Sequence, residues 1–154
     1  MGLREIIDEK YKISIKSKNF DLINTLRLVR SSIKDKDIEN RSSDSSELIN
    51  DQSILILLQN LIKQRKDSIE SFKKANRSDL IEKEEKEIEI INQFLPKQLD
   101  KAEINTIIEE IIKKENLSSI KDMGKLMSLL KSKYSGSIDI GIASKIAKEL
   151  LLKR

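Results

Sequence analysis

The feature that most constrains the fold is an apolar pattern with helical spacing that continues through nearly the whole chain. Leu22, Leu26 and Val29, for example, lie three or four positions apart, which places side chains on one face of an α-helix. The 154 residues include four glycines and one proline, too few for the turns of a protein with many strands. The sequence therefore predicts an all-α fold.

The apolar periods and the residues between them predict where the helices lie. In chain order we expect them at about 2–17, 20–40, 47–75, 78–95, 101–115, 120–134 and 140–153. Three acidic or hydroxyl residues are followed three positions later by a carboxylate, the spacing of a capping box: Asp79–Glu82, Asp100–Glu103 and Ser119–Asp122. We also expect Asp139 to cap the last helix and Gly136 to end the one before it in a left-handed conformation.

Pro96 divides the chain into two parts that differ in charge. The residue before a proline is disfavoured in a helix, so the fourth helix is expected to end there. We expect an N-terminal helical domain at 1–96, with a long helical hairpin, and a small C-terminal three-helix bundle at 97–154. The first part has 18 basic and 18 acidic residues, and the second has 12 and 8. The second part therefore carries the whole surplus of +4.

The composition excludes several classes of active site. With no cysteine, the chain has no thiol nucleophile, disulfide or zinc–thiolate site. With no histidine, it has no Ser–His–Asp triad and no imidazole metal ligand. No apolar run reaches the roughly 18–20 residues of a membrane span, and the N-terminus lacks the apolar stretch of a signal peptide. We expect a cytoplasmic protein without catalytic residues, metal, cofactor or membrane contact.

Two patterns that suggest ligand sites have simpler interpretations. Gly124-Lys125 resembles the end of a phosphate-binding loop, but the positions that need glycine and a hydroxyl residue hold Ser119 and Leu126. A nucleotide site is therefore not expected. The three glutamates of one helical face suggest a site for a divalent cation, but the lysines between them favour helix-stabilising pairs; these are Glu82, Glu85 and Glu89.

Two other charged groups favour structural roles as well. On the third helix, Asp67 and Glu70 are placed to pair with Arg77 or Lys74 and so lock the hairpin turn. On the second helix, a basic stripe is expected to be a solvated face; it consists of Arg27, Arg30 and Lys34.

Lysines flank the predicted turn at Gly136 on two adjacent helices of the net-positive part. They are Lys121, Lys125, Lys131, Lys133, Lys145 and Lys148. Such a surface suits contact with phosphates, and lysine recognises charge rather than base sequence. Tyr134 is the only aromatic residue nearby, so a platform that stacks single-stranded bases is not expected. The residues alone leave open whether this surface binds nucleic acid or is only solvated.

Four stretches, in order, resemble the GatB/YqeY family, and specifically its free-standing YqeY-like members. They are LRLVRSSIK at 26–34, RKDSIESFKKANRSDLIEKEEKEI at 65–88, INQFLPKQLDKAEI at 91–104 and MGKLMSLLKSKYSG at 123–136. The chain departs from the family at Phe94, where tyrosine is typical. It departs again at Ser137-Ile138-Asp139, where the family often has a basic residue.

The resemblance implies a bacterial-type helical protein in two parts. The C-terminal part is similar to the tail of the B subunit of glutamine-dependent tRNA amidotransferases, which helps to hold the tRNA. The implied partners are therefore tRNA or another structured RNA, and amidotransferase or translation components. The residues expected to bind RNA are Lys125, Lys131, Lys133 and Lys145, with Gly124 and Gly136 allowing close approach. Two alternatives remain: a carbon–nitrogen ligase with glutamine as amido donor, and a protein–protein adaptor without RNA.

Overall fold

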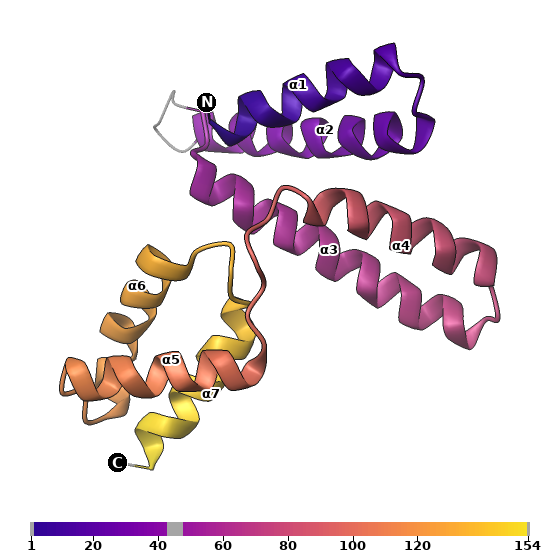
Figure 1. Ribbon diagram of the computed structural model, residues 1–154. Coiled ribbons are helices and arrows are strands. Elements are labelled where there is room, and N and C mark those ends of the chain that lie inside the picture. Colours follow the sequence, from indigo (N-terminus) through magenta and orange to yellow (C-terminus); the bar gives the residue numbers. More distant parts are fainter. Residues whose placement is uncertain (1, 43–47, 154) are drawn as a thin grey trace. The chain divides into compact units, whose positions relative to one another are not determined.

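The computed structural model describes residues 2–42 and 48–153, and that part of the chain is helical without any strand (Figure 1). The all-α prediction is therefore confirmed. The expected start of the third helix at residue 47 lies outside the described residues. The chain divides into two compact units, Met1–Leu95 (unit 1) and Pro96–Arg154 (unit 2).

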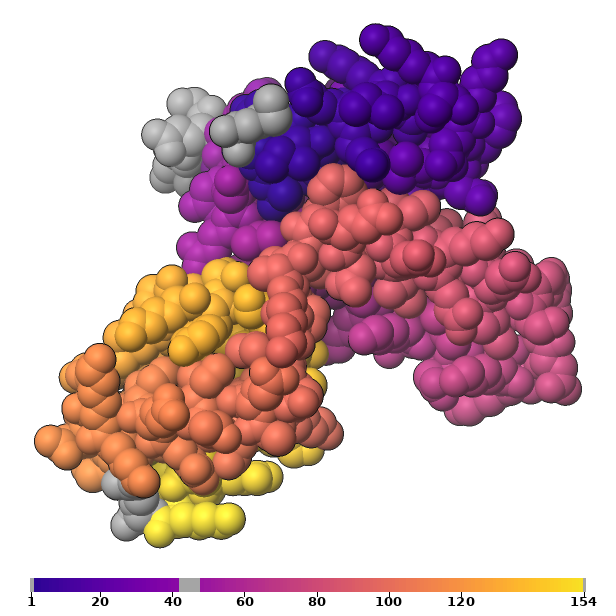
Figure 2. Space-filling view, viewed as in Figure 1, coloured from indigo at the N-terminus to yellow at the C-terminus, as the bar shows by residue number. Residues whose placement is uncertain are grey.

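The described residues of unit 1 form two helical pairs. The first pair is α1, Leu3–Lys16, with α2, Phe20–Ser42; the second is α3, Asp51–Lys74, with α4, Ser78–Asn92. Helices α3 and α4 form the long hairpin seen in Figure 1, and their side chains meet along it (Figure 2). The core contains the fully buried Leu26, Leu58 and Ile91. These residues come from α2, α3 and α4, so packing of the apolar stripes of these helices holds them together.

The turn between α3 and α4 does not form as the capping pattern predicted. Asn76 adopts a left-handed conformation with φ of 54°, and the Arg77 backbone N–H donates to the Phe72 carbonyl. The chain therefore enters α4 at Ser78, one residue before Asp79. As a result Asp79 does not cap the helix, and its carboxylate accepts two hydrogen bonds of 3.2 Å from the Arg77 guanidinium.

The predicted lock across the same turn is also wrong. Glu70 Oε1 lies 3.4 Å from Lys73 Nζ, one turn along its own helix, and Arg77 is occupied by Asp79. Both pairs are exposed and local, so each contributes little to stability.

Unit 2 contains α5, Lys101–Lys114, α6, Met123–Tyr134, and α7, Ile140–Leu152, with a short 3₁₀ turn at Ile120–Asp122. Its core is separate from that of unit 1 and includes Ile108, Leu130 and Ala147, all fully buried. The two small residues of α7 that face the core, Ala143 and Ala147, let α7 pack closely against α5.

The helix ends of unit 2 follow the sequence prediction. Both predicted capping boxes form, Asp100–Glu103 on α5 and Ser119–Asp122 on the 3₁₀ turn. Asp139 Oδ1 accepts hydrogen bonds from the backbone N–H groups that open α7, at 2.8 Å and 3.2 Å. Gly136 has φ of 83°, the left-handed conformation expected at the end of α6. These caps fix the ends of the two helices that carry the lysines.

Candidate nucleic-acid interface

The predicted lysines of α6 are exposed, but they do not share one face of the helix. Leu126 and Leu130 point into the core, and Lys125, Lys131 and Lys133 are exposed. An α-helix turns about 100° per residue, so Lys131 and Lys133 project from opposite flanks of α6. The helix therefore presents cations on both sides of its outer surface.

The predicted lysine of α7 also points away from the core. Lys145 is exposed and lies two positions after the buried Ala143, which places it on the opposite side of the helix. Lys148 is exposed one turn further along. Helix α7 thus adds positive charge to the outer surface of unit 2.

Lys125 has a carboxylate partner at the end of α5. Lys125 Nζ lies 3.6 Å from Glu115 Oε2 at the end of α5, and the Lys125 side chain is 59% exposed. An ion pair so exposed contributes about 0–1 kcal/mol. A phosphate can therefore replace Glu115 as the partner of Lys125 at little cost.

The two predicted glycines have different environments. Gly124 is exposed in the first turn of α6, and a Cβ built on it meets no atom within 4 Å. Its backbone is therefore open to a ligand. Gly136 is buried, and its carbonyl accepts a hydrogen bond from the Gln98 side chain. The structure shows Gly136 as a turn residue, and its place in a phosphate contact stays a prediction.

The glutamates of α4 are arranged as a solvated helix surface. Glu82 Oε1 lies 3.9 Å from Lys86 Nζ, and both side chains are exposed. Within the described ranges, no group of three or more Asp, Glu, His or Cys residues has the geometry to hold a metal ion.

The sequence prediction missed a partly buried charge cluster between α3 and α4, centred on the buried Arg65. Arg65 Nε lies 2.8 Å from Glu87 Oε2 and 4.0 Å from Glu84 Oε2, and one of its terminal NH groups donates to the Leu61 carbonyl at 2.9 Å. Burial and the charge of Glu87 raise the pKa of Glu84. The signal was present in the sequence, because all three charged residues fall on the apolar stripes of their helices.

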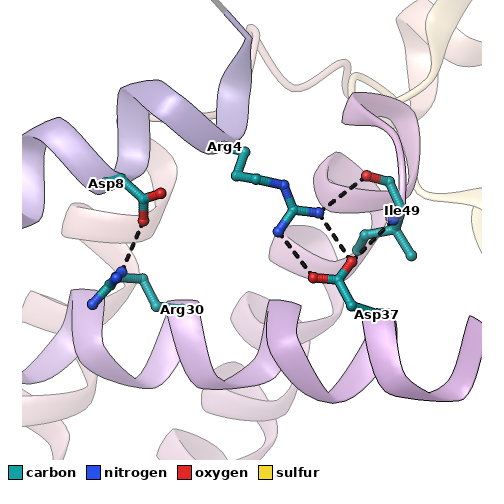
Figure 3. Close-up of polar contacts among 5 residues, drawn as sticks. All are labelled: Arg4, Asp8, Arg30, Asp37 and Ile49. Carbon is teal, nitrogen blue, oxygen red and sulfur yellow. Dashed lines mark hydrogen bonds and ion pairs between the residues drawn. The ribbon is translucent and has the colours of Figure 1, made fainter. Parts of the chain in front are cut away.

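A second missed network joins α1, α2 and the segment that leads into α3 (Figure 3). The Arg4 guanidinium donates to both carboxylate oxygens of the buried Asp37, at 2.9 Å and 3.0 Å, and to the Ile49 carbonyl at 3.2 Å. The Ile49 backbone N–H returns a hydrogen bond to Asp37 at 3.0 Å. The hydrogen bonds from Arg4 hold the pKa of Asp37 below its usual range. This network fixes α1 against α2 and against the segment that leads into α3.

The basic stripe of α2 is not a uniform solvated face. Arg30 Nε donates to Asp8 Oδ1 at 2.8 Å (Figure 3), and its guanidinium lies 4.4 Å from the centre of the Tyr11 ring. Arg27 Nε lies 3.5 Å from the Tyr11 hydroxyl. The stripe therefore faces α1 and forms one wall of an open groove between the two helices.

Comparison with protein families gives a match over nearly the whole chain. The YqeY-like protein family matches residues 4–151. The chain belongs to the YqeY-like family. The match covers both compact units, so the family includes the neutral helical unit as well as the basic one.

Three relatives illustrate the range of similarity. An uncharacterized protein of Schizosaccharomyces pombe is 39% identical over 95 residues, which are 62% of this chain and 73% of that protein. The mitochondrial protein named altered inheritance of mitochondria protein 41 of Pyrenophora tritici-repentis is 29% identical over 151 residues, 91% of this chain and 76% of that protein. The protein of the same name from Lachancea thermotolerans is 49% identical over 71 residues, which are 46% of this chain and 36% of that protein.

The relatives' names bear on the expected location. The named relatives are described as mitochondrial, which differs from the cytoplasmic location expected from the sequence. They also give no support to the expectation of a bacterial-type protein. Among the described residues, no helix combines the length and apolar character that a bilayer-crossing segment needs.

Proposed function

We propose that this YqeY-like protein is a non-catalytic accessory protein that binds tRNA, or another structured RNA, through the lysine-bearing helices of unit 2. One observation carries the proposal: all four predicted lysines are exposed on α6 and α7, in the unit that holds the whole surplus of positive charge. The similarity of this part to the tail of the amidotransferase B subunit supports it. Association with tRNA amidotransferase or other translation components, in the cytoplasm, belongs to the same proposal.

The arrangement of the lysines favours RNA recognised by shape. Helix α6 carries cations on both flanks and is about 10–12 Å wide with its side chains. The minor groove of A-form RNA is wide and shallow, and proteins recognise it mainly through phosphates and 2′-hydroxyls. Lysines on both flanks can meet phosphates on both sides of such a groove. Binding of this kind is insensitive to base sequence.

A matched pair of variants tests the proposal. The first replaces Lys125, Lys131, Lys133 and Lys145 with glutamine. The control replaces four other exposed lysines of unit 2 in the same way, at positions 97, 101, 113 and 114. Each set removes four charges and includes a lysine with a weak, exposed ion pair, Lys125 with Glu115 in the first set and Lys97 with Glu103 in the control. The two variants therefore differ in where the charge is lost and not in how much.

Fluorescence anisotropy with labelled tRNA measures the outcome. The salt slope is the change in the logarithm of the binding constant with the logarithm of the salt concentration, and each lost phosphate contact lowers its magnitude by about 0.7–0.9. The slope should therefore fall by about 3–4 in the first variant and by much less in the control. Equal losses in both variants, or no binding by the wild type at low salt, would end the proposal. Formation of amide from glutamine, ATP and mischarged tRNA by the chain alone would replace it with the ligase alternative.

A further inference from the structure

The open groove between α1 and α2 gathers positive charge in a unit that is neutral overall. It has a volume of about 360 Å³. Its walls include Arg4, Arg27, Arg30 and Lys34 against two carboxylates, Asp8 and Asp37. The groove therefore carries a local charge of +2, although residues 1–96 have equal numbers of basic and acidic residues.

Two of these four cations are held in place by the protein. Arg4 is occupied by Asp37 and the Ile49 carbonyl. Arg30 is fixed between Asp8 and the face of Tyr11, a cation–π contact that orients the guanidinium. Figure 3 shows both arginines reaching from different helices toward carboxylates of the neighbouring helix. These contacts give the groove a fixed shape before any ligand binds.

The other two cations, Arg27 and Lys34, make few contacts with the described residues. Arg27 has five N–H donors, and its one described contact is the long approach to the Tyr11 hydroxyl. Lys34 is exposed and makes no ion pair with the described residues. They lie seven positions apart, so they share one face of α2 at a spacing of about 10 Å. Ser31 lies between them on that face and offers a hydroxyl.

We propose that this groove is a phosphate-binding surface for an RNA backbone, in which Arg27 and Lys34 contact the phosphates. Arg27 and Lys34 have N–H donors available for a ligand, and Ser31 between them offers a hydroxyl. Arginine, lysine and hydroxyl side chains are the groups that commonly contact the phosphates of a nucleic acid. Asp37 and Asp8 balance the charges of Arg4 and Arg30 within the groove, so the net charge of +2 comes from Arg27 and Lys34. The lowered pKa of Tyr11, caused mainly by the hydrogen bond from Arg27, is consistent with positive potential at this point.

This inference goes beyond the proposed function, because it concerns unit 1 and does not need the lysines of unit 2. The test uses the full chain with Arg27→Gln and Lys34→Gln together. The matched control is Lys63→Gln with Lys66→Gln, which removes two charges from exposed positions on α3 of the same unit. A third variant, Arg27→Lys with Lys34→Arg, keeps the charge. Circular dichroism verifies that each variant is folded.

We expect the groove variant to lower the salt slope of tRNA binding by about 1.5–2 relative to wild type. The control on α3 should leave the slope nearly unchanged, and the charge-preserving variant should retain most of the binding. The same loss should appear when the four lysines of unit 2 are already glutamine. The Arg27 Nε–H signal in NMR spectra of the wild type should shift on addition of tRNA.

Three results would overturn the inference. The first is an equal effect of the groove variant and the α3 control. The second is an Arg27 signal that tRNA does not move. The third is saturation of that signal by a mononucleotide or inorganic phosphate with no response to tRNA, which would assign the groove to a small phosphate ligand. If the unit 2 variant binds tRNA like wild type while the groove variant does not, the proposed function of unit 2 fails and the groove stands.

Discussion

Two glutamates beside one buried arginine should respond differently to the same substitution. The side chain of Arg65 is 9% exposed, and its Nε lies 2.8 Å from Glu87 but 4.0 Å from Glu84. At an effective dielectric constant of about 20, those distances correspond to gross attractions of about 6 and 4 kcal/mol. Breaking a fully buried pair costs about 3–5 kcal/mol. Because Glu87 is 21% exposed, we expect Glu87→Gln to destabilise unit 1 by about 2–4 kcal/mol.

Glu84→Gln should have a much smaller effect, of neutral or stabilising sign. Burial and the charge of Glu87 raise the pKa of Glu84 above 4.5, so the folded protein disfavours its charged form. A neutral amide removes that penalty and leaves the closer pair intact. The free energy of unfolding should stay within about 1 kcal/mol of wild type. The raised pKa also means that the wild type gains stability as the pH falls through the folded pKa toward 4.5, and this variant should lose that gain.

Native-state hydrogen exchange measures both substitutions within unit 1. The amides of α3 and α4 report on the hairpin, and those of α5 to α7 serve as an internal control that should not change. Equal destabilisation by the two variants would refute the reasoning, because it would mean that the 1.2 Å difference between the two distances in the ion cluster has no energetic consequence.

Three further substitutions test other parts of the structure. Asp37→Asn should lower the free energy of unfolding of unit 1 by about 2–4 kcal/mol. The lowered pKa of this carboxyl gives the wild type stability that is present above pH 3.8 and lost as the pH falls through the folded pKa. Urea titrations in which the free energy of unfolding does not fall over this acidic range would contradict the prediction. Gly136→Ala should lower the opening free energy measured by hydrogen exchange at the α6 and α7 amides by about 1–2 kcal/mol, because Gly136 has φ of 83°. An unchanged exchange rate at these amides would argue against backbone strain in the variant. Arg27→Gln should raise the pKa of Tyr11 in an ultraviolet titration with Tyr134→Phe present, and a fall would contradict the assigned cause.

Local patterns predicted the helices well, because the signals that fix their ends lie within a few residues. The Asp100–Glu103 capping box needs only neighbouring atoms, and it forms as predicted. The exception shows the limit of such reasoning. Asp79 has the same spacing to Glu82, but the turn at the left-handed Asn76 lets α4 begin at Ser78. Asp79 therefore lies inside the helix, where its carboxylate accepts hydrogen bonds from Arg77.

The apolar stripes could show that Arg65, Glu84 and Glu87 are partly buried, but the partners within the charge networks could not be predicted, because they depend on which helices face each other. The sequence placed Arg27 and Arg30 on one stripe of α2. It gave no indication that Asp8 and Tyr11 of α1 would lie opposite that stripe. By contrast, the exposure of Lys131 and Lys133 could be predicted from the apolar period of α6. The pairing of Lys125 with Glu115 could not be predicted, because it depends on the packing of α6 near the end of α5.

The central claim is that the protein holds RNA by phosphate contacts from defined cations. The most direct measurement is the dependence of tRNA affinity on salt for the wild type, for the four-lysine variant of α6 and α7, and for its matched control in unit 2. The account predicts a slope about 3–4 smaller for the α6 and α7 variant than for the wild type, with the control close to wild type. Slopes that are the same for all three proteins would contradict it.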